Sequence, residues 1–403
     1  MMKKLLTVCA AALLLWGCVP EELMLRQPPE EDPAAPVVIA AFLPLSGENR
    51  IYAEQMREGL LCAEARLNRI HGINGRKVKV AFLDTAGSAG GTLDALKSAE
   101  KLGAVAAVAG YDTDEVGMLI AHADRLRMPM VIPLATSDYH LQVSSFVYRN
   151  CFSDLQQMEV LAAYLLHWRQ RSSGGIVTDQ GSGEEYTRGI SRDFAQAMRD
   201  LGGSITGEIT LSGGALLSDA QLRALLVPDP RFILISSGGK RAAALVRQIR
   251  EAGFNGILCG PDTMDDDEFI HALAGVEPGE MIYTAFFSEE NSSREFKEFR
   301  KDFRAKFFHN PGACETQSYD ALIFLSVGLD KAENLLDFDK NWRTIRNHYG
   351  AAAAYTMLKK GQVDRTVYLK SLGVDRMGEK IRPYPRLSRQ IQYSKLQDYK
   401  LMK

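Results

Sequence analysis

The sequence predicts an α/β protein of two lobes, each a doubly wound parallel sheet with helices on both faces. The first reason is that short apolar runs alternate with stretches of helical period along most of the 403 residues. The second is the segment 104–138, where a buried strand ending in Gly110, a helix and a second strand form a right-handed crossover. The third is that this alternation starts again after residue 150, and the chain is longer than one typical domain.

The first lobe is expected to repeat a strand–helix order three times. Thr113 can cap the third helix, with Asp114 and Glu115 in its first turn near the positive end of the helix dipole. A last strand starts after Pro129 and stops at the polar Thr136. The expected strands are 37–43, 78–83, 104–110 and 130–135, and the expected helices are 52–70, 93–102 and 116–127.

The second lobe repeats the pattern. Its expected strands are 175–179, 204–211, 231–236 and 256–260, and its expected helices are 155–169, 186–201, 222–226 and 241–252. The run 281–287 is expected to be a strand returning to the first lobe, followed by helices 293–308 and 319–329 and a hairpin of 355–358 with 367–369. These assignments give lobe 1 as 37–150 plus 282–330, lobe 2 as 151–281 plus 331–375, and a C-terminal tail, 376–403, that is basic and Tyr-rich without a clear pattern.

The N-terminus has the pattern of a processing signal. Residues 1–17 carry Lys3 and Lys4 before a short apolar run. The run ends in Leu-Trp-Gly-Cys, which resembles a bacterial lipobox in which Cys18 becomes the lipidated first residue. A plain secretory signal cut near Gly17 is the alternative. Residues 18–36 are rich in Pro and acid, so we expect an anchor and tether that place the protein in the cell envelope, lipid-anchored on the periplasmic face.

Composition and motifs exclude several classes of protein. The net charge of −2 offers no basic footprint for nucleic acid. We find no nucleophile elbow, P-loop or H-E-x-x-H pattern, so an enzyme, a cofactor and a metal site are not expected. Beyond the signal, the four Cys residues could form disulfides in three full pairings or remain buried thiols; they are Cys62, Cys151, Cys259 and Cys314.

Polar residues at the ends of the predicted strands mark a candidate binding site. In an open parallel sheet, ligands bind outside the carboxyl ends of the strands. Thr113, Thr136 and Ser137 follow two such strands and offer hydroxyl groups beside free backbone N–H groups, which suits a small polar molecule. The plain alternative is that these residues only cap helices and turns.

An ordered set of motifs resembles one family over about residues 37–375. These motifs are Pro44-Leu45-Ser46-Gly47, Gly72-Ile73-Asn74-Gly75-Arg76-Lys77-Val78, Val108-Ala109-Gly110, Pro129 to Ser137, Tyr148-Arg149, Gly260-Pro261-Asp262 and Tyr319-Asp320-Ala321. The chain resembles the type I periplasmic-binding-protein superfamily, in particular the branched-chain amino-acid-binding receptors of ABC transporters. The resemblance implies two lobes joined by a multi-strand hinge that close on a ligand.

The resemblance also implies roles for individual residues. Thr136 and the loop after Gly110 would hold a ligand carboxylate, and the other candidate ligand-binding residues beside them are Thr113, Asp114, Ala135 and Ser137. Tyr52 would lie at the rim of lobe 1. In lobe 2, Tyr186 would pack on the ligand and Asp262 would accept a ligand ammonium group.

One loop departs from the family pattern. The family's loop after Gly110 is rich in Ser and Thr, whereas here Asp112, Asp114 and Glu115 surround one Thr. A carboxylate in the cleft would repel a ligand carboxylate within about 4–6 Å. The acids therefore either compensate the helix dipole in solvent or select an amine or a neutral polar ligand, and the ligand's identity stays open.

Two hypotheses of function follow. The first is a monomeric, lipid-anchored receptor that binds a small polar metabolite, amino-acid-like, amide or amine, and presents it to an ABC-transporter permease. The alternative is an envelope lipoprotein that uses the same fold for sensing or for activating a partner such as a cell-wall synthase.

Overall fold

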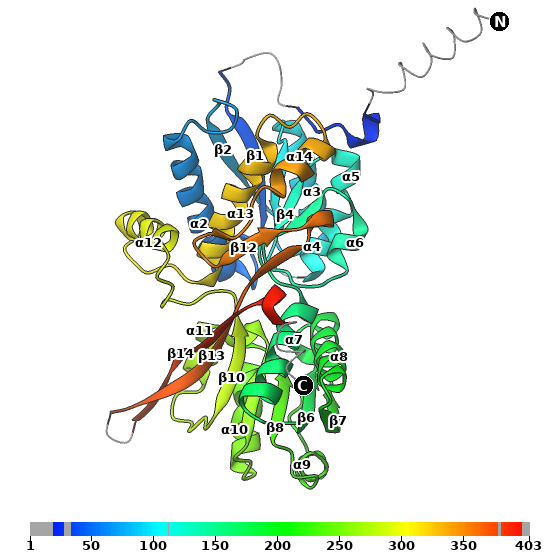
Figure 1. Cartoon of the computed structure of the whole chain (residues 1–403), viewed down its shortest axis with the longest axis vertical. Coiled ribbons are helices and arrows are strands. Elements are labelled where there is room, and N and C mark those ends of the chain that lie inside the picture. The colour runs from blue at the N-terminus through cyan, green and yellow to red at the C-terminus, as the bar shows by residue number, and fades with distance from the viewer. Residues whose placement is uncertain (1–18, 28–33, 112, 378–379, 397–403) are drawn as a thin grey trace, which may run out of the picture.

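The computed structural model describes residues 19–27, 34–111, 113–377 and 380–396 (Figure 1). The predicted signal segment, Cys18 and Asp112 lie outside the described residues, so lipidation at Cys18 stays a prediction. Across the described ranges, no helix combines the length and the apolar character that a membrane crossing requires.

The first lobe is a five-stranded parallel sheet in the order β2-β1-β3-β4-β5. Its strands are β1 Val37–Leu43, β2 Val78–Asp84, β3 Ala106–Ala109, β4 Met130–Ile132 and β5 Val147–Arg149. The helices that follow these strands are α2 Arg50–Arg69, α3 Ala89–Lys101, α4 Thr113–Ile120, α5 Ala123–Leu126 and α6 His140–Val143. The helix expected over 116–127 is thus two helices, which a turn at 121–122 separates.

The second sheet has nine strands in the path β11-β12-β13-β10-β9-β8-β6-β7 with β14 paired to β13. Its strands are β6 Ser173–Asp179, β7 Ser204–Leu211, β8 Phe232–Ser236, β9 Ile257–Gly260, β10 Met281–Ala285, β11 His348–Tyr349, β12 Ala354–Met357, β13 Val363–Met377 and β14 Lys380–Gln392. Helices cover its parallel part: α7 Asp154–Ala163, α8 Glu184–Asp200, α9 Asp219–Leu226, α10 Gly239–Glu251 and α11 Asp267–Ala272.

The strand at 281–285 corrects one expectation. We expected it to return to the first lobe, but β10 pairs with β9 in parallel, with Met281 opposite Leu258, and with β13 antiparallel. β10 is therefore an inner strand of the second sheet, paired on both of its edges. An apolar run shows that a strand is buried, but it does not specify which sheet edge satisfies its backbone groups.

The segment after residue 330 gives a second correction. We assigned 331–375 to lobe 2, yet α14 Leu335–Trp342 packs on the first lobe. Phe338 and Trp342 lie against Tyr148 of β5, with ring centroids 4.7 and 5.1 Å from it. Burying this aromatic cluster holds α14 beside α13 Ala313–Leu329, in the same upper lobe that also carries α12 Arg294–Phe307 (Figure 1).

The chain passes between the lobes at three places: between β5 and α7, between β10 and α12, and within β13. Arg365 of β13 pairs with β12, whereas Tyr368 to Ser371 pair with β10 of the second lobe. The expected hairpin exists, but its second strand starts at Val363 and not at 367. The tail that had no clear pattern forms β14, and the β13–β14 hairpin projects from the second lobe (Figure 1).

Part of the predicted tether is folded against the first lobe. Residues Glu21–Leu23 form a short 3-10 helix. Leu25 is buried and its N–H donates to the carbonyl of Glu333 at 3.0 Å, while Arg26 N donates to the carbonyl of Arg127 at 3.1 Å. Arg26 Nη2 also donates to the carbonyl of Glu100 at 2.8 Å, so the segment docks through a few contacts that the polar composition of 18–36 did not indicate.

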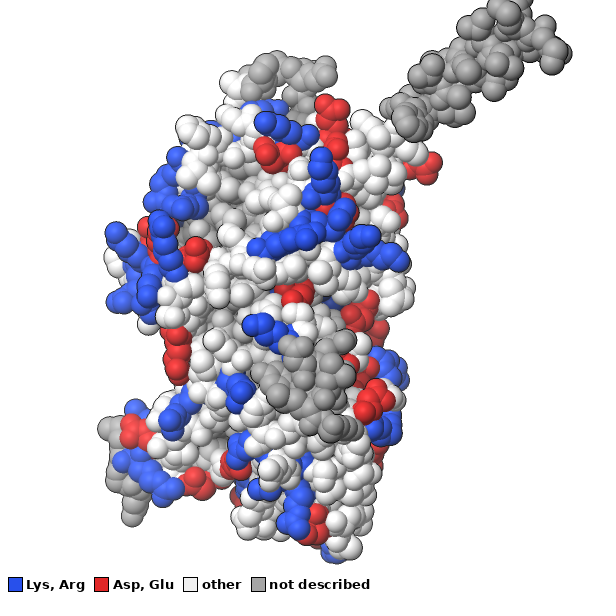
Figure 2. All heavy atoms as spheres, viewed as in Figure 1, with Lys and Arg blue, Asp and Glu red and all other residues white. Residues whose placement is uncertain are grey.

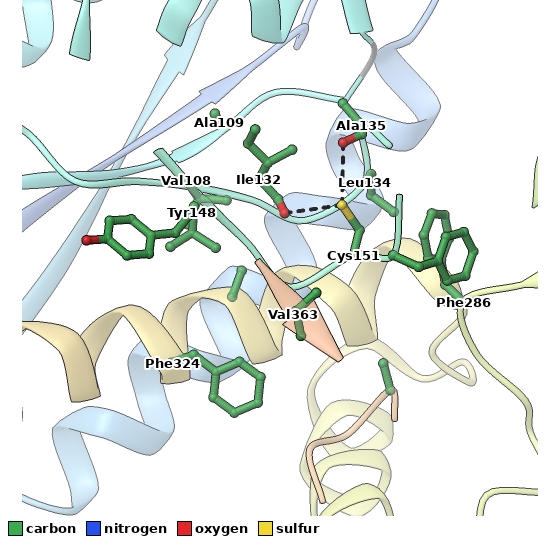
Figure 3. Packing of buried hydrophobic residues seen from close by; sticks show 14 of the residues in the cluster. Val108, Ala109, Ile132, Leu134, Ala135, Tyr148, Cys151, Phe286, Phe324 and Val363 are labelled. Carbon is green, nitrogen blue, oxygen red and sulfur yellow. Dashed lines mark hydrogen bonds between the residues drawn. The ribbon is translucent and has the colours of Figure 1, made fainter. Parts of the chain in front are cut away.

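The core of the first lobe continues toward the crossovers (Figure 3). Val108, Ile132 and Tyr148 come from neighbouring strands, and Phe324 of α13 and Val363 of β13 lie close by. The Cys151 thiol lies among them and donates to the carbonyls of Ile132 and Ala135 (Figure 3). The four cysteines of the folded lobes are all free thiols, so no disulfide forms between them.

Candidate functional site

A cavity of about 240 Å³ lies between the two lobes. The first lobe contributes Thr113, Ser137, Asp138, Tyr139 and Gln142 to its lining, and the second lobe contributes Asp154, Glu185, Tyr186, Gly189, Arg192 and Asp193. On the side where α6 and α8 lie, Figure 2 shows Asp and Glu side chains at the level where the lobes meet. The cavity is thus lined largely by polar and acidic groups.

The first-lobe wall is the loop after β4, and a buried arginine holds it. Arg149 has no exposed surface, and it donates to the carbonyls of Thr136 at 3.1 Å and Ser137 at 2.7 Å. Its guanidinium also lies 3.7 Å from the Asp138 carboxylate. Because these carbonyls are fixed from behind, the Ser137 and Asp138 side chains are presented toward the cavity.

Thr136 connects this loop to the second lobe. Thr136 is 2% exposed, and its carbonyl accepts the N–H of Asp154 at 3.0 Å. Its hydroxyl also hydrogen-bonds the Asp154 carboxylate. Thr136 therefore lies behind the cavity wall, and its side chain acts on a cavity residue, Asp154.

The second-lobe wall is built around Tyr186 in the first turn of α8. The Tyr186 hydroxyl donates to Asp262 Oδ1 at 2.8 Å. The N–H of Asp262 donates to Gln157 Oε1 at 3.2 Å, and the Thr284 hydroxyl donates to the same Gln157 oxygen at 2.6 Å. This chain of bonds from β10 through α7 fixes the Asp262 carboxylate next to the cavity.

Both carboxyl groups at the lobe junction have raised pKa values. Burial raises the pKa of Asp154 to about 7, against the hydrogen bond from Thr136, and the charge of Asp262 raises it further. Burial also raises the pKa of Asp262 to about 6, although the bonds from Tyr186 and Gln157 lower it. Arg192, the cationic side chain in the cavity lining, pairs with Asp193 at 2.8 Å. The cavity therefore has an excess of acid.

A second contact between the lobes lies near the cavity. The Tyr52 hydroxyl of α2 donates to Asp266 beside α11, and the Tyr52 ring stacks on Tyr111 with centroids 4.4 Å apart. Burial raises the Tyr52 pKa, and the bond to Asp266 raises it further, so the phenol stays protonated as a donor. This bond joins one lobe directly to the other.

The predicted site residues are distributed unevenly over this junction. Thr113, Ser137 and Tyr186 line the cavity. Thr136 and Asp262 each hydrogen-bond a residue of the lining. Tyr52 lies in the second contact between the lobes.

Two further predicted residues point elsewhere. Asp114 is exposed in the first turn of α4. Ala135 is buried, and its carbonyl accepts the Cys151 thiol at 3.4 Å. Neither is among the residues that line the cavity.

Several residues of the junction were not predicted, and Asp154 is the most important. Asp154 is the first residue of α7, and it follows Ser153, which forms a capping box with Gln156. The Ser-Asp-Leu-Gln sequence directly after the first crossover indicates the start of a helix, but it does not indicate that Asp154 faces a cavity. Glu185, Arg192 and Asp193 lie on one face of α8, which the helical period could have indicated.

The sequence that forms these two lobes matches a known protein family. The family described as Periplasmic binding protein matches residues 36–368, and the chain belongs to that family. Its two α/β lobes, crossed three times by the chain with a cavity between them, are the fold of this class.

The relatives are binding proteins by name. The Leu/Ile/Val-binding protein BraC3 of Rhizobium johnstonii is 27% identical over 312 residues, 75% of this chain and 81% of the relative. The Leu/Ile/Val-binding protein homolog 3 of Brucella melitensis is 25% identical over 254 residues, 62% of this chain and 67% of the relative.

Solved structures agree on the fold. The leucine-binding protein LivK of Thermotoga maritima superposes with a TM-score of 0.73 at 23% identity, covering 88% of this chain and 99% of that one. LivJ of Streptococcus pneumoniae, in complex with isoleucine, gives a TM-score of 0.72 at 19% identity, covering 88% and 100%. These comparisons do not favour the alternative of a partner-activating lipoprotein.

Proposed function

We propose that this protein is the substrate-binding receptor of an ABC transporter, and that it makes or breaks no covalent bond in its ligand. The ligand is a small amino-acid-like molecule, an amide or an amine, which binds between the lobes and is presented to a permease. The family supports this class of function, and the relatives' names support an amino-acid-like ligand.

One observation carries the choice of ligand. Asp154 and Asp262 lie at the lobe junction, and the cavity lining offers them no unpaired cation, because Arg192 pairs with Asp193. A buried carboxylate without a cation is unfavourable unless it protonates or gains a partner. A ligand ammonium or amide N–H group would supply that partner, and an anionic ligand would be repelled.

Closure of the lobes gives this binding its selectivity. A ligand shifts a two-state protein toward the closed state only through contacts that differ between the states. Ser137 and Tyr186 lie on opposite walls of the cavity, so a ligand that bonds both favours closure.

Anchoring and location complete the proposal. With a lipid on Cys18, the receptor would be held in the cell envelope on its periplasmic face and would act as a monomer. The segment 19–27, which docks on the first lobe, would orient the globule relative to that anchor.

A thermal-shift screen followed by calorimetry tests the proposal. The panel contains leucine, isoleucine, valine, small amides, amines and organic acids. We expect an amino- or amide-bearing compound to raise the melting temperature, because a ligand that binds only the folded state stabilises it. We also expect Asp262→Asn to weaken its binding.

Tyr384→Phe, on the hairpin far from the cavity, is the control and should bind the ligand as the parent does. If no compound of the panel moves the melting temperature, the receptor function is refuted. If only organic acids bind, the receptor function stands and the choice of ligand is wrong.

A further inference from the structure

Three side chains with metal-binding atoms meet on the first lobe, outside the cavity. They are Glu58 of α2, His309 after α12 and Glu315 of α13, and their ligand atoms all lie within 4.8 Å of one another. Figure 1 places α2, α12 and α13 together on one side of the upper lobe. The sequence shows no metal-binding motif here, because the three residues are far apart in the chain and belong to different elements.

A glycine brings the two carboxylates together. A Cβ atom on Gly59 would lie 2.2 Å from the carbonyl oxygen of Glu315, so only glycine permits this approach of the two helices. Glu58 is the preceding residue of α2. The helix packing that excludes a side chain at position 59 therefore sets the Glu58 carboxylate beside Glu315.

The imidazole of His309 is held between two hydrogen-bond acceptors. Its Nδ1 lies 3.0 Å from the carbonyl of Asn310, and its Nε2 lies 3.0 Å from Glu58 Oε2. A neutral imidazole carries one N–H, so it can donate to only one of them. When Nδ1 donates to the carbonyl, the Nε2 lone pair faces a carboxylate, and either a proton or a metal ion between the two atoms would satisfy both.

Glu315 adds a buried negative charge to the same place. It is 3% exposed, and its Oε2 accepts the N–H of Gly312 at 3.0 Å. Burial raises its pKa, the charge of Glu58 raises it further, and His309 lowers it. Two carboxylates and one imidazole thus lie within reach of a single ion.

We propose that Glu58, His309 and Glu315 bind a divalent transition-metal ion, with zinc as the ion that fits best. One imidazole and two carboxylates are ligands that zinc accepts, with a water molecule in the fourth tetrahedral position. The imidazole disfavours calcium and magnesium, which prefer oxygen ligands. The His309 side chain is 49% exposed, so the ion and its water can reach the site from solvent.

The Nδ1 contact with a backbone carbonyl supports this assignment. A metal-bound histidine usually donates its other ring N–H to a carbonyl or carboxylate, which sets the tautomer and orients the ring. The ring edge of His309 also packs on Phe303, with centroids 5.1 Å apart. The imidazole is therefore oriented before any ion arrives.

Zinc titration of the purified, metal-stripped protein tests the proposal by calorimetry and thermal shift. We expect one zinc per chain and a higher melting temperature, with no comparable effect of magnesium or calcium. His309→Ala and Glu58→Gln should each weaken zinc binding by at least about tenfold, since losing even an outer-shell partner costs that much. Cobalt at the same site should give visible d–d bands that His309→Ala removes.

His271→Ala is the matched control, because His271 is an exposed helical histidine on the other lobe. If it lowers zinc affinity as much as His309→Ala does, the assignment is overturned. The other contradicting result is an imidazolium that merely pairs with the carboxylates. In that case zinc would change the melting temperature of neither the parent nor His309→Ala.

Discussion

Two buried polar networks lie close to the lobe junction, and they differ in how their charges are balanced. On the hinge side, Arg365 is fully buried and donates to the Asn150 carbonyl at 3.0 Å and to Gln317 Oε1 at 2.8 Å. Asp320 accepts the N–H groups of residues 351 and 352 and the Tyr355 hydroxyl, with donor–acceptor distances of 2.7 to 2.9 Å. This network contains both a cation and an anion.

On the cavity side the cations pair with other acids, Arg192 with Asp193 and Arg149 with Asp138, and among the described residues no ion pair joins a cation to Asp154 or Asp262. Asp154 and Asp262 receive hydrogen bonds from neutral groups. The charge of Asp262 raises the pKa of Asp154, and the charge of Asp265 raises the pKa of Asp262. The difference is instructive because burial alone does not mark a binding site. A balanced network holds the lobes together, whereas an unbalanced one is prepared for a partner that arrives from outside.

The largest effect is expected at the balanced network. Arg365→Met should lower the free energy of unfolding by about 3–5 kcal/mol, because it leaves several buried acceptors, among them the carbonyls of Asn150 and Phe286 and Gln317 Oε1, without their donor. Urea unfolding measures this change. Arg382→Met, an exposed arginine on β14, is the control and should stay within about 0.5 kcal/mol of the parent. A loss at Arg365 no larger than the control would contradict the comparison.

The pH dependence of the ligand-free protein should reveal the buried Asp154 carboxyl group. The folded pKa of Asp154, about 7, lies above its ordinary value of 3.8, so the folded state binds a proton that the unfolded state has released. Stability should therefore fall as pH rises from about 4 to 7, by up to about 1.4 kcal/mol per pH unit for one group. Asp262, and Asp320 of the other network, act in the same direction up to about pH 6, so only Asp154 extends the effect toward pH 7 among these three groups.

Melting curves of the parent and of Asp154→Asn between pH 4.5 and pH 8 measure this dependence. The variant cannot ionise at that position, so its curve should be flatter than the parent's. Parallel curves for the two proteins would mean that Asp154 does not titrate in this range.

The smallest effect is expected from a single hydroxyl in the second-lobe wall. Tyr186→Phe removes the donor to Asp262 and should weaken binding of the best ligand by about 1.5–3 kcal/mol, the range for one hydrogen bond to a charged group. Calorimetry measures the affinity. Unchanged affinity together with an unchanged melting temperature would place Tyr186 outside the binding interaction.

Much of the fold could be predicted from local patterns. The buried strands at 37–43 and 232–236 are continuous apolar runs, and the helix at 50–69 has a clear helical period. Strand ends also pointed to Thr113 and Ser137, because parallel strands bring their carboxyl ends to one edge. The sheet membership of 281–285 and the packing of 335–342 could not be predicted, since both depend on which distant edge or aromatic cluster receives them.

The sequence by itself determined the α/β lobes, the family and the chemistry available at the strand ends, because hydrophobic period, turn residues and ordered motifs are local properties. Only the tertiary structure decided which acids are buried without an ion-pair partner and which distant carbonyl and amide oxygens accept hydrogen bonds from Arg365. It also decided that Glu58, His309 and Glu315 meet. Charge balance and metal-binding geometry depend on distances between residues far apart in the chain, and those distances exist only after the helices and sheets have packed.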